Sequence, residues 1–353
     1  MVMIALDLLK KSNFGYYFII IAAALSALIH VVSKPMLATG NNQMEINPIV
    51  MTFLVYFICG IFFTPLAKKS KTVSKFVRKD IIFMVLIGIA EVFGLITYFY
   101  GLSDSTAVNA SIFSNSEIIF ALIIAMLVFK EKLHIKEYIP FSMLVIGMMV
   151  IPIGDDLYQH DFRLSSLVIG DVLIVFSGLL FAIDITMSKY IAERFDIKRI
   201  AQIVSFIGAA ITIIIIVIFQ IPFNLNWTQL PGIFIISILG TGMSTIFFLM
   251  GLRIIGAVRT VLLYSTTSVF GVAFAGVILS ESITIADILS LSLVFGGIFF
   301  LRYRLVETKI VETKTTYMAN NYSTDDLYMV LDKKTIEVVN SIQIAQLQRK
   351  LKN

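Results

Sequence analysis

Ten apolar stretches constrain the fold of this chain more than any other feature of its sequence. They lie near residues 14–34, 48–67, 80–101, 105–129, 136–153, 167–189, 200–221, 231–252, 257–279 and 284–303. Each is close to the length of about 20 apolar residues that a helix needs to cross a bilayer. Composition agrees, because only 14% of the residues are charged, against about 25% in soluble domains. The sequence therefore predicts an all-α integral membrane protein with ten transmembrane helices.

The second half of the chain repeats the first half at a constant spacing. Residues 107–147 align with 257–297 without a gap, at a shift of 150 positions. The shared residues are Ala107, Val108, Phe120, Ala125, Glu131, Ile135, Ser142 and Gly147, which fall on Ala257, Val258, Phe270, Ala275, Glu281, Ile285, Ser292 and Gly297. Most other positions differ, so it is the constant register that indicates a duplication. Duplicated sets of membrane helices are typical of transporters.

Further matches extend the repeat upstream. Gly101 and Leu102 match Gly251 and Leu252 at the same shift, and the segment LSALIHVVSK (25–34) resembles LFAIDITMSK in the sixth span. We therefore expect a first repeat, a linker, a second repeat and a polar tail, over residues 1–153, 154–166, 167–303 and 304–353 respectively. Apolar residues recur at roughly helical spacing in the tail, which is compatible with a short amphipathic helix.

Lysine and arginine are concentrated in alternate loops. The loop 68–79 carries six of them, whereas 154–166 carries only Arg163. Loops rich in lysine and arginine lie on the cytoplasmic side of a cell membrane. We therefore expect both termini and the 68–79 loop to be cytoplasmic and 154–166 to be external. Binding of anionic lipid or nucleic acid is the alternative for the 68–79 loop, and we expect no nucleic-acid partner.

The two halves are expected to have opposite orientations in the membrane. An odd number of helices in each half, here five, inverts the second half relative to the first. The elbow KEKLHIKE (130–137) is basic, whereas its counterpart SESITIAD (280–287) contains no lysine or arginine. The sequence thus predicts two inverted five-helix repeats, with a site at their interface near the membrane midplane.

Three blocks of sequence carry a resemblance to a known family: NSEIIFALIIAMLVFKEKL (115–133), GDVLIVFSGLLFAIDITMSK (170–189) and LGTGMSTIFFLMGLRIIGA (239–257). Over about residues 14–303 the chain resembles the drug/metabolite transporter superfamily, specifically its EamA-type branch of ten-helix permeases. The resemblance implies export of amino acids, other metabolites or drugs, and relatives exchange phosphorylated sugars or nucleotide sugars. The family often has proline just after the glutamate in the fourth span. Here Ile118 stands in its place, so the sequence offers no proline that would unwind the helix there.

Three carboxyl groups lie at membrane depth. Glu91 is midway along the third span, Glu117 is midway along the fourth, and Asp184 is in the sixth. Ionisable groups are costly there and usually face a cavity. Glu91 and Glu117 have no basic neighbour on their own spans, which suits proton coupling or the capture of a substrate amine. The alternatives are a protonated carboxyl bonded to a neighbouring helix and, for Asp184, an ion pair with Lys189.

Two residues nearer the outer ends of the first and third spans are further candidates. Tyr98 lies seven positions beyond Glu91, two turns along the same face of the helix, which favours it over Tyr100 as a cavity residue. His30 is either a pH-sensing gate or a histidine that packs between helices.

The last candidates surround Glu117 and its counterpart. Asn115 lies two residues from Glu117, about 200° around the helix, so we expect that the two cannot both point directly at one ligand. Tyr264 and Thr267 occupy the positions of Ser114 and Glu117 at the shift of 150. The site is therefore expected to be acidic on one side only. Glu131 and Glu281, which end their spans, are interpreted as caps of the elbows or partners in ion pairs.

Together these features predict a secondary transporter. We expect it to export small metabolites across the cell membrane by alternating access, with amino acids or related polar amines favoured, as a monomer or homodimer. A broad-specificity drug exporter is the main alternative, which the 29 phenylalanines leave open. A membrane-embedded enzyme would need clustered His, Asp or Ser groups that the sequence lacks. The three histidines offer no metal-ligand spacing, so no enzymatic activity, metal or cofactor is expected.

Overall fold

All of the regular secondary structure in the described part of the chain is helical. A computed structural model describes residues 2–37, 46–68, 77–128, 138–151, 166–192, 194–255, 260 and 263–300. Six of its helical segments are long and apolar enough to cross a membrane: Phe14–Leu37, Pro48–Ala67, Arg78–Asp104, Ile169–Ser188, Ile197–Ile218 and Trp227–Ile255. The prediction of an all-α membrane protein is thereby confirmed. The elbow 130–137 and the tail 304–353 lie outside the described residues, as does the expected linker apart from Ser166.

The long helices coincide with six of the expected spans. They are α1 (Val2–Leu37), α2 (Pro48–Lys68), α3 (Arg78–Asp104), α7 (Ser166–Ala192), α8 (Ile197–Ile218) and a segment composed of η3 (Trp227–Gln229), α9 (Leu230–Phe234), η4 (Ile235–Met243) and α10 (Ser244–Ile255). The other expected spans contain shorter elements, namely α4 (Ala107–Phe113), α5 (Ser116–Val128), α6 (Tyr138–Ile151), α12 (Thr267–Phe274), η5 (Ala275–Leu279) and a helix at Ile285–Phe300. The count of ten spanning helices stays a prediction.

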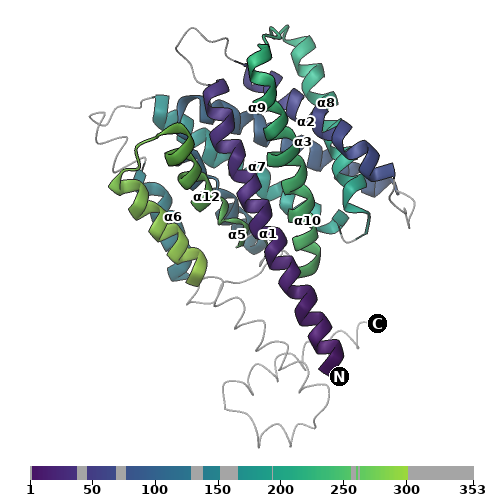
Figure 1. Ribbon diagram of the computed structural model, residues 1–353, viewed down its shortest axis with the longest axis vertical. Helices are drawn as coiled ribbons and strands as arrows, with labels where there is room; N and C mark the ends of the chain where they lie inside the picture. Colours follow the sequence, from purple (N-terminus) through teal and green to yellow (C-terminus); the bar gives the residue numbers. More distant parts are fainter. Residues whose placement is uncertain are drawn as a thin grey trace, which may run out of the picture. The chain divides into compact units, whose positions relative to one another are not determined.

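If each helix is replaced by its counterpart in the other half of the chain, every main helix pair becomes another main pair or remains the same pair. Helix α3 packs against α7, and its counterpart α10 packs against α1, while α2 packs on α8 and α4 on α12. Figure 1 shows α1 crossing the front of the bundle between α12 and α10. Both crossings use glycine. A Cβ on Gly101 would lie 2.6 Å from the Gly170 carbonyl oxygen, and one on Gly251 would lie 3.4 Å from that of Gly15.

The fourth span is interrupted in its middle, although no proline follows Glu117. A turn at Ser114–Asn115 separates α4 from α5. The Ser114 hydroxyl donates to the Ser111 carbonyl at 2.8 Å, and the Asn115 amide donates to the Ile112 carbonyl at 3.0 Å. Polar side chains that bond nearby carbonyls compete with the helical hydrogen-bond ladder. Two polar residues therefore break this helix where the family often uses proline.

The counterpart in the second half is interrupted at the matching place. A turn at Ser265–Thr266 precedes α12, within one residue of the position given by the shift of 150. The hydroxyls of Thr266, Thr267 and Ser268 each donate to the carbonyl three residues earlier, at 2.8, 2.6 and 2.8 Å. The same side-chain chemistry thus ends the regular helix in both halves.

A π-helix, η4, widens the eighth span at the depth of the cavity described below. The thiol of Cys59 donates to the Ser237 carbonyl at 2.9 Å, which draws that carbonyl toward α2. Glycines at 240 and 242 allow α1 and α2 to approach, because a Cβ there would meet Ile29 at 2.8 Å and Phe62 at 3.3 Å. Wide turns of this kind are rare and frequently occur at functional sites. Nothing in the periodicity of the sequence predicts this one.

An ion pair with one buried partner joins the start of α3 to Arg194, two residues beyond the end of α7. Asp80 is fully buried and pairs with Arg194 at 2.6 Å. The Asp80 carboxylate also accepts from the Val77 backbone N–H at 2.9 Å, so it caps the start of α3. An apolar cluster lies beside the pair and contains Met84, Ile87, Ile191, Phe195, Ile200 and Val204. Removing one partner of such a pair leaves an uncompensated buried charge, which is costly.

Candidate functional site

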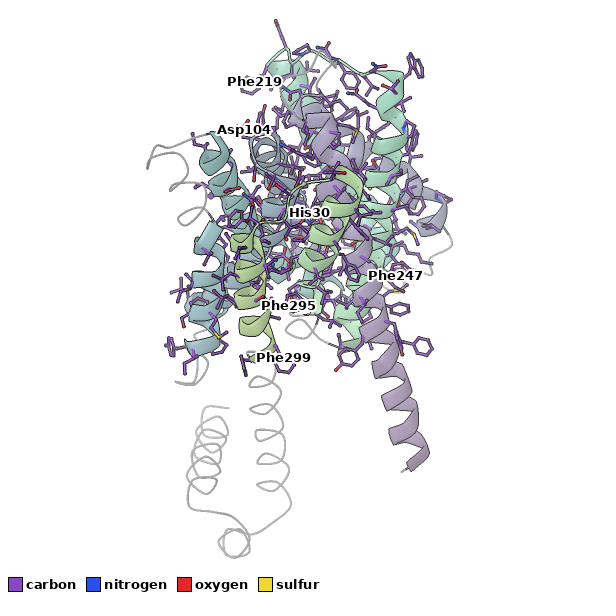
Figure 2. All side chains as sticks on the ribbon, turned by 60° about the vertical axis from the view of Figure 1, so that its left-hand side comes forward. His30, Asp104, Phe219, Phe247, Phe295 and Phe299 are labelled. Carbon is purple, nitrogen blue, oxygen red and sulfur yellow. The ribbon has the colours of Figure 1, made fainter. Side chains whose placement is uncertain are left out.

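A cavity of about 200 Å³ lies among the helices, and all eight predicted site residues line it. These are His30, Glu91, Tyr98, Asn115, Glu117, Asp184, Tyr264 and Thr267. They come from α1, α3, the α4–α5 break, α7 and the start of α12. Figure 2 shows His30 in the middle of the helices, with Asp104 toward one end and Phe247 toward the other. The cavity therefore lies at the interface of the two halves.

The three carboxyl groups form an array across the cavity. Asp184 lies near enough to both Glu91 and Glu117 for its charge to act on each of them. Glu91 is hydrogen-bonded to the Tyr56 hydroxyl, and Asp184 accepts from the Ser188 hydroxyl at 2.8 Å. The expected ion pair between Asp184 and Lys189 is untested, because the Lys189 side chain lies outside the described residues.

The described residues that line the cavity include no lysine or arginine. Carboxyl groups at membrane depth that have no basic partner are stable only when protons or a bound cation neutralise part of their charge. The chemistry of the cavity therefore suits a positively charged ligand. Among the described residues no group of three or more His, Cys, Asp or Glu side chains could hold a metal ion.

The break between α4 and α5 explains how Asn115 and Glu117 both reach the cavity. On a continuous helix they would point to different sides, as the sequence predicts, but here both line the cavity. Asn115 lies in the turn and Glu117 in the first turn of α5, so the helical angle between them does not apply. Gly178 of α7 supports this geometry, because a Cβ there would lie 2.8 Å from the Glu117 backbone nitrogen.

Hydroxyl groups and aromatic rings complete the wall. Tyr264 is hydrogen-bonded to the hydroxyls of Ser26 and Ser244, and its ring packs edge-on against Phe248 with centroids 4.8 Å apart. Aromatic rings at such a site can stack on a flat substrate or hold a cation over their faces. The cavity thus combines an acidic array with aromatic surface.

His30 and Tyr98 close the cavity on the side toward the C-terminal end of α3. The His30 Nδ1 and the Tyr98 hydroxyl form a hydrogen bond, and both side chains are buried. The other ring nitrogen of His30 has no hydrogen-bond partner within the described part of the protein. Tyr98 lines the cavity, whereas Tyr100 does not and is exposed.

Several lining residues were not predicted from the sequence. Tyr56, Ser188, Ser26 and Ser244 each bond to one of the predicted residues. Their positions within apolar spans gave a weak signal, because a tyrosine or serine is tolerated at many places in a membrane helix. Glu281, in contrast, does not line the cavity; it caps α4 in the first half of the chain, where the sequence had predicted a cap of its own elbow or an ion pair. Glu131, its counterpart, lies outside the described residues.

Comparison with known proteins agrees with this geometry. A model of the EamA-like transporter family matches the chain twice, over residues 13–152 and 168–303. An uncharacterized transporter of Methanothermobacter thermautotrophicus is 27% identical over 304 residues, which is 81% of this chain and 85% of that protein. An S-adenosylmethionine uptake transporter of Rickettsia bellii is 25% identical over 252 residues, 69% of this chain and 77% of that protein.

A solved crystal structure shares the fold, with a TM-score of 0.57 and 15% identity over 82% of this chain and 96% of that one. The family matches cover most of the chain and coincide with the helices that build the cavity. The chain therefore belongs to the EamA-like transporter family and is a multi-pass membrane transporter of small molecules.

Proposed function

We propose that the chain is a secondary transporter for small organic cations, with amino acids or related polar amines as favoured substrates. The observation that carries this proposal is the array of Glu91, Asp184 and Glu117 in a cavity without lysine or arginine among its described lining residues. A cationic group of a substrate would compensate the charge that burial makes costly. The relative named for S-adenosylmethionine supports a cationic substrate, because that molecule carries a sulfonium and an amino group.

Alternating access between two inverted repeats is the proposed mechanism. Three observations support it: the two family matches, the helix pairs that correspond between the two halves, and the helix breaks at corresponding positions. Protons could compete with the substrate for the same carboxyl groups, which would couple transport to a proton gradient. The boundaries of the repeats at 1–153 and 167–303 belong to this proposal.

A broad-specificity exporter of lipophilic cations is the second candidate. The aromatic rings of Phe63, Phe181 and Phe248, together with those of Tyr56, Tyr98 and Tyr264, line the cavity and favour it. Such a transporter would accept bulky aromatic cations as well as simple amines. The two candidates therefore differ in how strongly transport depends on substrate size and apolar surface.

Purified protein in liposomes would test the proposed function. We expect accumulation of a radiolabelled cation from a panel of S-adenosylmethionine, lysine, putrescine and tetraphenylphosphonium, and none of succinate, because the carboxyl array repels anions. The sequence predicts export and one relative is named an uptake transporter, so flux would be measured in both directions, with and without a pH gradient. Accumulation of succinate, or of no cation in either direction, would contradict the proposal.

The membrane orientation has its own test. Cysteines placed singly at Ser70 and Gln159, with Cys59 replaced by serine, should react oppositely with an impermeant thiol reagent. In intact cells only the cysteine at 159 should be labelled, because the basic 68–79 loop is expected on the cytoplasmic side. Equal labelling of both positions would exclude the inverted arrangement.

A further inference from the structure

The corner between α3 and α4, residues 102–108, is held by two opposite charges from elsewhere in the chain. The Lys34 ammonium of α1 donates to the carbonyls of Leu102 and Ser103, at 3.0 Å each. Carbonyls in the last turn of a helix lack partners within the helix, and the negative end of its dipole attracts a cation. Lys34 therefore caps the end of α3 from a different helix.

Glu281 does the converse for α4. Its two carboxylate oxygens accept from the backbone N–H groups of Ala107 and Val108, at 3.0 and 2.9 Å. These N–H groups begin a helix and have no partner within it, and the positive end of the helix dipole favours an anion. The chain turns sharply at Ser280, with φ of 56°, just before Glu281. Glu281 comes from the second half of the chain and binds the first.

The two capping charges also act on each other. Lys34 lies near the carboxylates of Glu281 and Asp104, which attract its ammonium group. On the other side of the corner, the Ser105 hydroxyl donates to Asp171 of α7. We call the pair of Lys34 and Glu281 on residues 102–108 the charge clamp.

The charge clamp lies directly beyond one end of the cavity. Lys34 is one turn from His30 on α1, and Leu102 is one turn from Tyr98 on α3. The same faces of α1 and α3 are therefore joined at two successive turns, by the His30–Tyr98 bond and by the Lys34–Leu102 bond. On the α3–α7 side the backbones touch at Gly101 and Gly170, which leaves no path between these two helices. Toward the opposite end the lining continues to Ile200, in the first turn of α8.

We infer that the charge clamp is a gate, with Lys34 and Glu281 as positioning residues for transport that lie outside the cavity. This inference rests on the proposed alternating access. Closed, the clamp joins α1 and the second half to the α3–α4 corner and separates the cavity from the nearer membrane surface. Opening requires the corner to leave both caps, so the bonds of Lys34 and Glu281 set how often the cavity is reached from that side.

Thiol labelling would test the gate without any substrate. Ser177 of α7 lines the cavity about two turns from Gly170. A Ser177→Cys variant with Cys59→Ser would be treated with an impermeant maleimide in right-side-out and in inside-out vesicles. Glu281→Ala and Lys34→Met should each raise the labelling rate about tenfold from one side only, because charge-assisted hydrogen bonds are lost from the closed state. Glu281→Gln, which keeps one acceptor oxygen, should give a smaller rise.

Two further variants sharpen the test. Asp196→Ala removes a carboxylate cap of the same kind from α8, where Asp196 accepts from the Lys198 N–H at 2.9 Å, and should leave labelling from the clamp side unchanged. The exchanged pair Lys34→Glu with Glu281→Lys should not restore closure, because lysine cannot accept from N–H groups and glutamate cannot donate to carbonyls.

Some results would overturn the gate. These are unchanged labelling in folded Glu281→Ala and Lys34→Met proteins, an equal rise from both sides, or closure restored by the exchanged pair. A failed substrate assay would count against the proposed function alone, because labelling requires no transport.

Discussion

Replacing Glu117 with glutamine is expected to reduce transport of the cationic substrate to background while expression stays near that of the unmodified protein. The substitution keeps the size of the side chain and its capacity for hydrogen bonds, but it removes the charge and the exchangeable proton. Glu117 lies at the start of α5 beside Asp184, where its charge faces the cavity. Any transport that remains should respond less to pH, because one of the three carboxyl groups that can bind a proton in the cavity is gone, while Glu91 and Asp184 remain.

The control for Glu117→Gln is Asp287→Asn. Asp287 is also a buried carboxyl, but it accepts from the Thr284 N–H at 2.8 Å at the start of the last described helix and does not line the cavity. The Asp287→Asn substitution should affect the stability of the protein more than its substrate selectivity. A Glu117→Gln protein that transports normally from about pH 5 to about pH 8 would refute the assignment and leave Glu91 and Asp184 as candidates.

A single methyl group at Gly101 is expected to destabilise the whole helix bundle. The Cβ of Gly101→Ala would lie 2.6 Å from the Gly170 carbonyl oxygen and 2.9 Å from the Ile174 backbone nitrogen, so backbone rather than a flexible side chain must move. Overpacking of this kind costs about 1–3 kcal/mol. We expect a clear fall in the thermal unfolding midpoint of the purified protein in detergent, together with loss of transport.

Gly296→Ala makes the same chemical change where the space permits it. Its Cβ would meet only the terminal methyl of Met143, at 3.0 Å, which can move aside. The unfolding midpoint of this variant should stay close to that of the unmodified protein. If both substitutions lowered the midpoint equally, the close crossing of α3 and α7 would not be the cause. Helix propensity could not explain such a loss, because alanine favours a helix more than glycine does.

The site could be predicted from the sequence because charge at membrane depth is rare. In an apolar span, Glu91, Glu117 and Asp184 stand out, and the cost of burying them argues for a cavity without any knowledge of the fold. Tyr98 followed from helical spacing relative to Glu91. Tyr56 could not be found in this way. The chain has 13 tyrosines, and burying a tyrosine in an apolar span does not carry the cost of burying a charged group.

The backbone irregularities were beyond prediction for a different reason. The break before Glu117 depends on hydrogen bonds that Ser114 and Asn115 form with carbonyls three residues earlier, and serine or asparagine in a membrane helix usually leaves the helix intact. The π-helix contains the Ser237 carbonyl, which accepts from the thiol of Cys59, 178 positions away. Such long-range contacts leave no local pattern.

The internal repeat in the sequence indicates contacts between the two halves as well as the number of spans. Ala107, Val108 and Glu281 are among the residues that the two halves share. In the structure the Glu281 carboxylate accepts from the N–H groups of Ala107 and Val108 and caps the helix that begins there. Residues that stay identical in two divergent halves can therefore indicate contacts between the halves. Glu281 is thus a cap, but of a helix in the other half and not of its own elbow, whereas the interpretation of Glu131 stays a prediction.

The helix α4 bears on the order in which the protein can be assembled in the membrane. All seven of its residues are buried, and it packs on α12, which the ribosome makes much later. A helix of this length covers about 10 Å, a third of the hydrocarbon core, and α4 has no face for lipid. Newly inserted α4 therefore lacks its packing partner until the second half has been synthesised. The first half completes its fold only after the rest of the chain has entered the membrane.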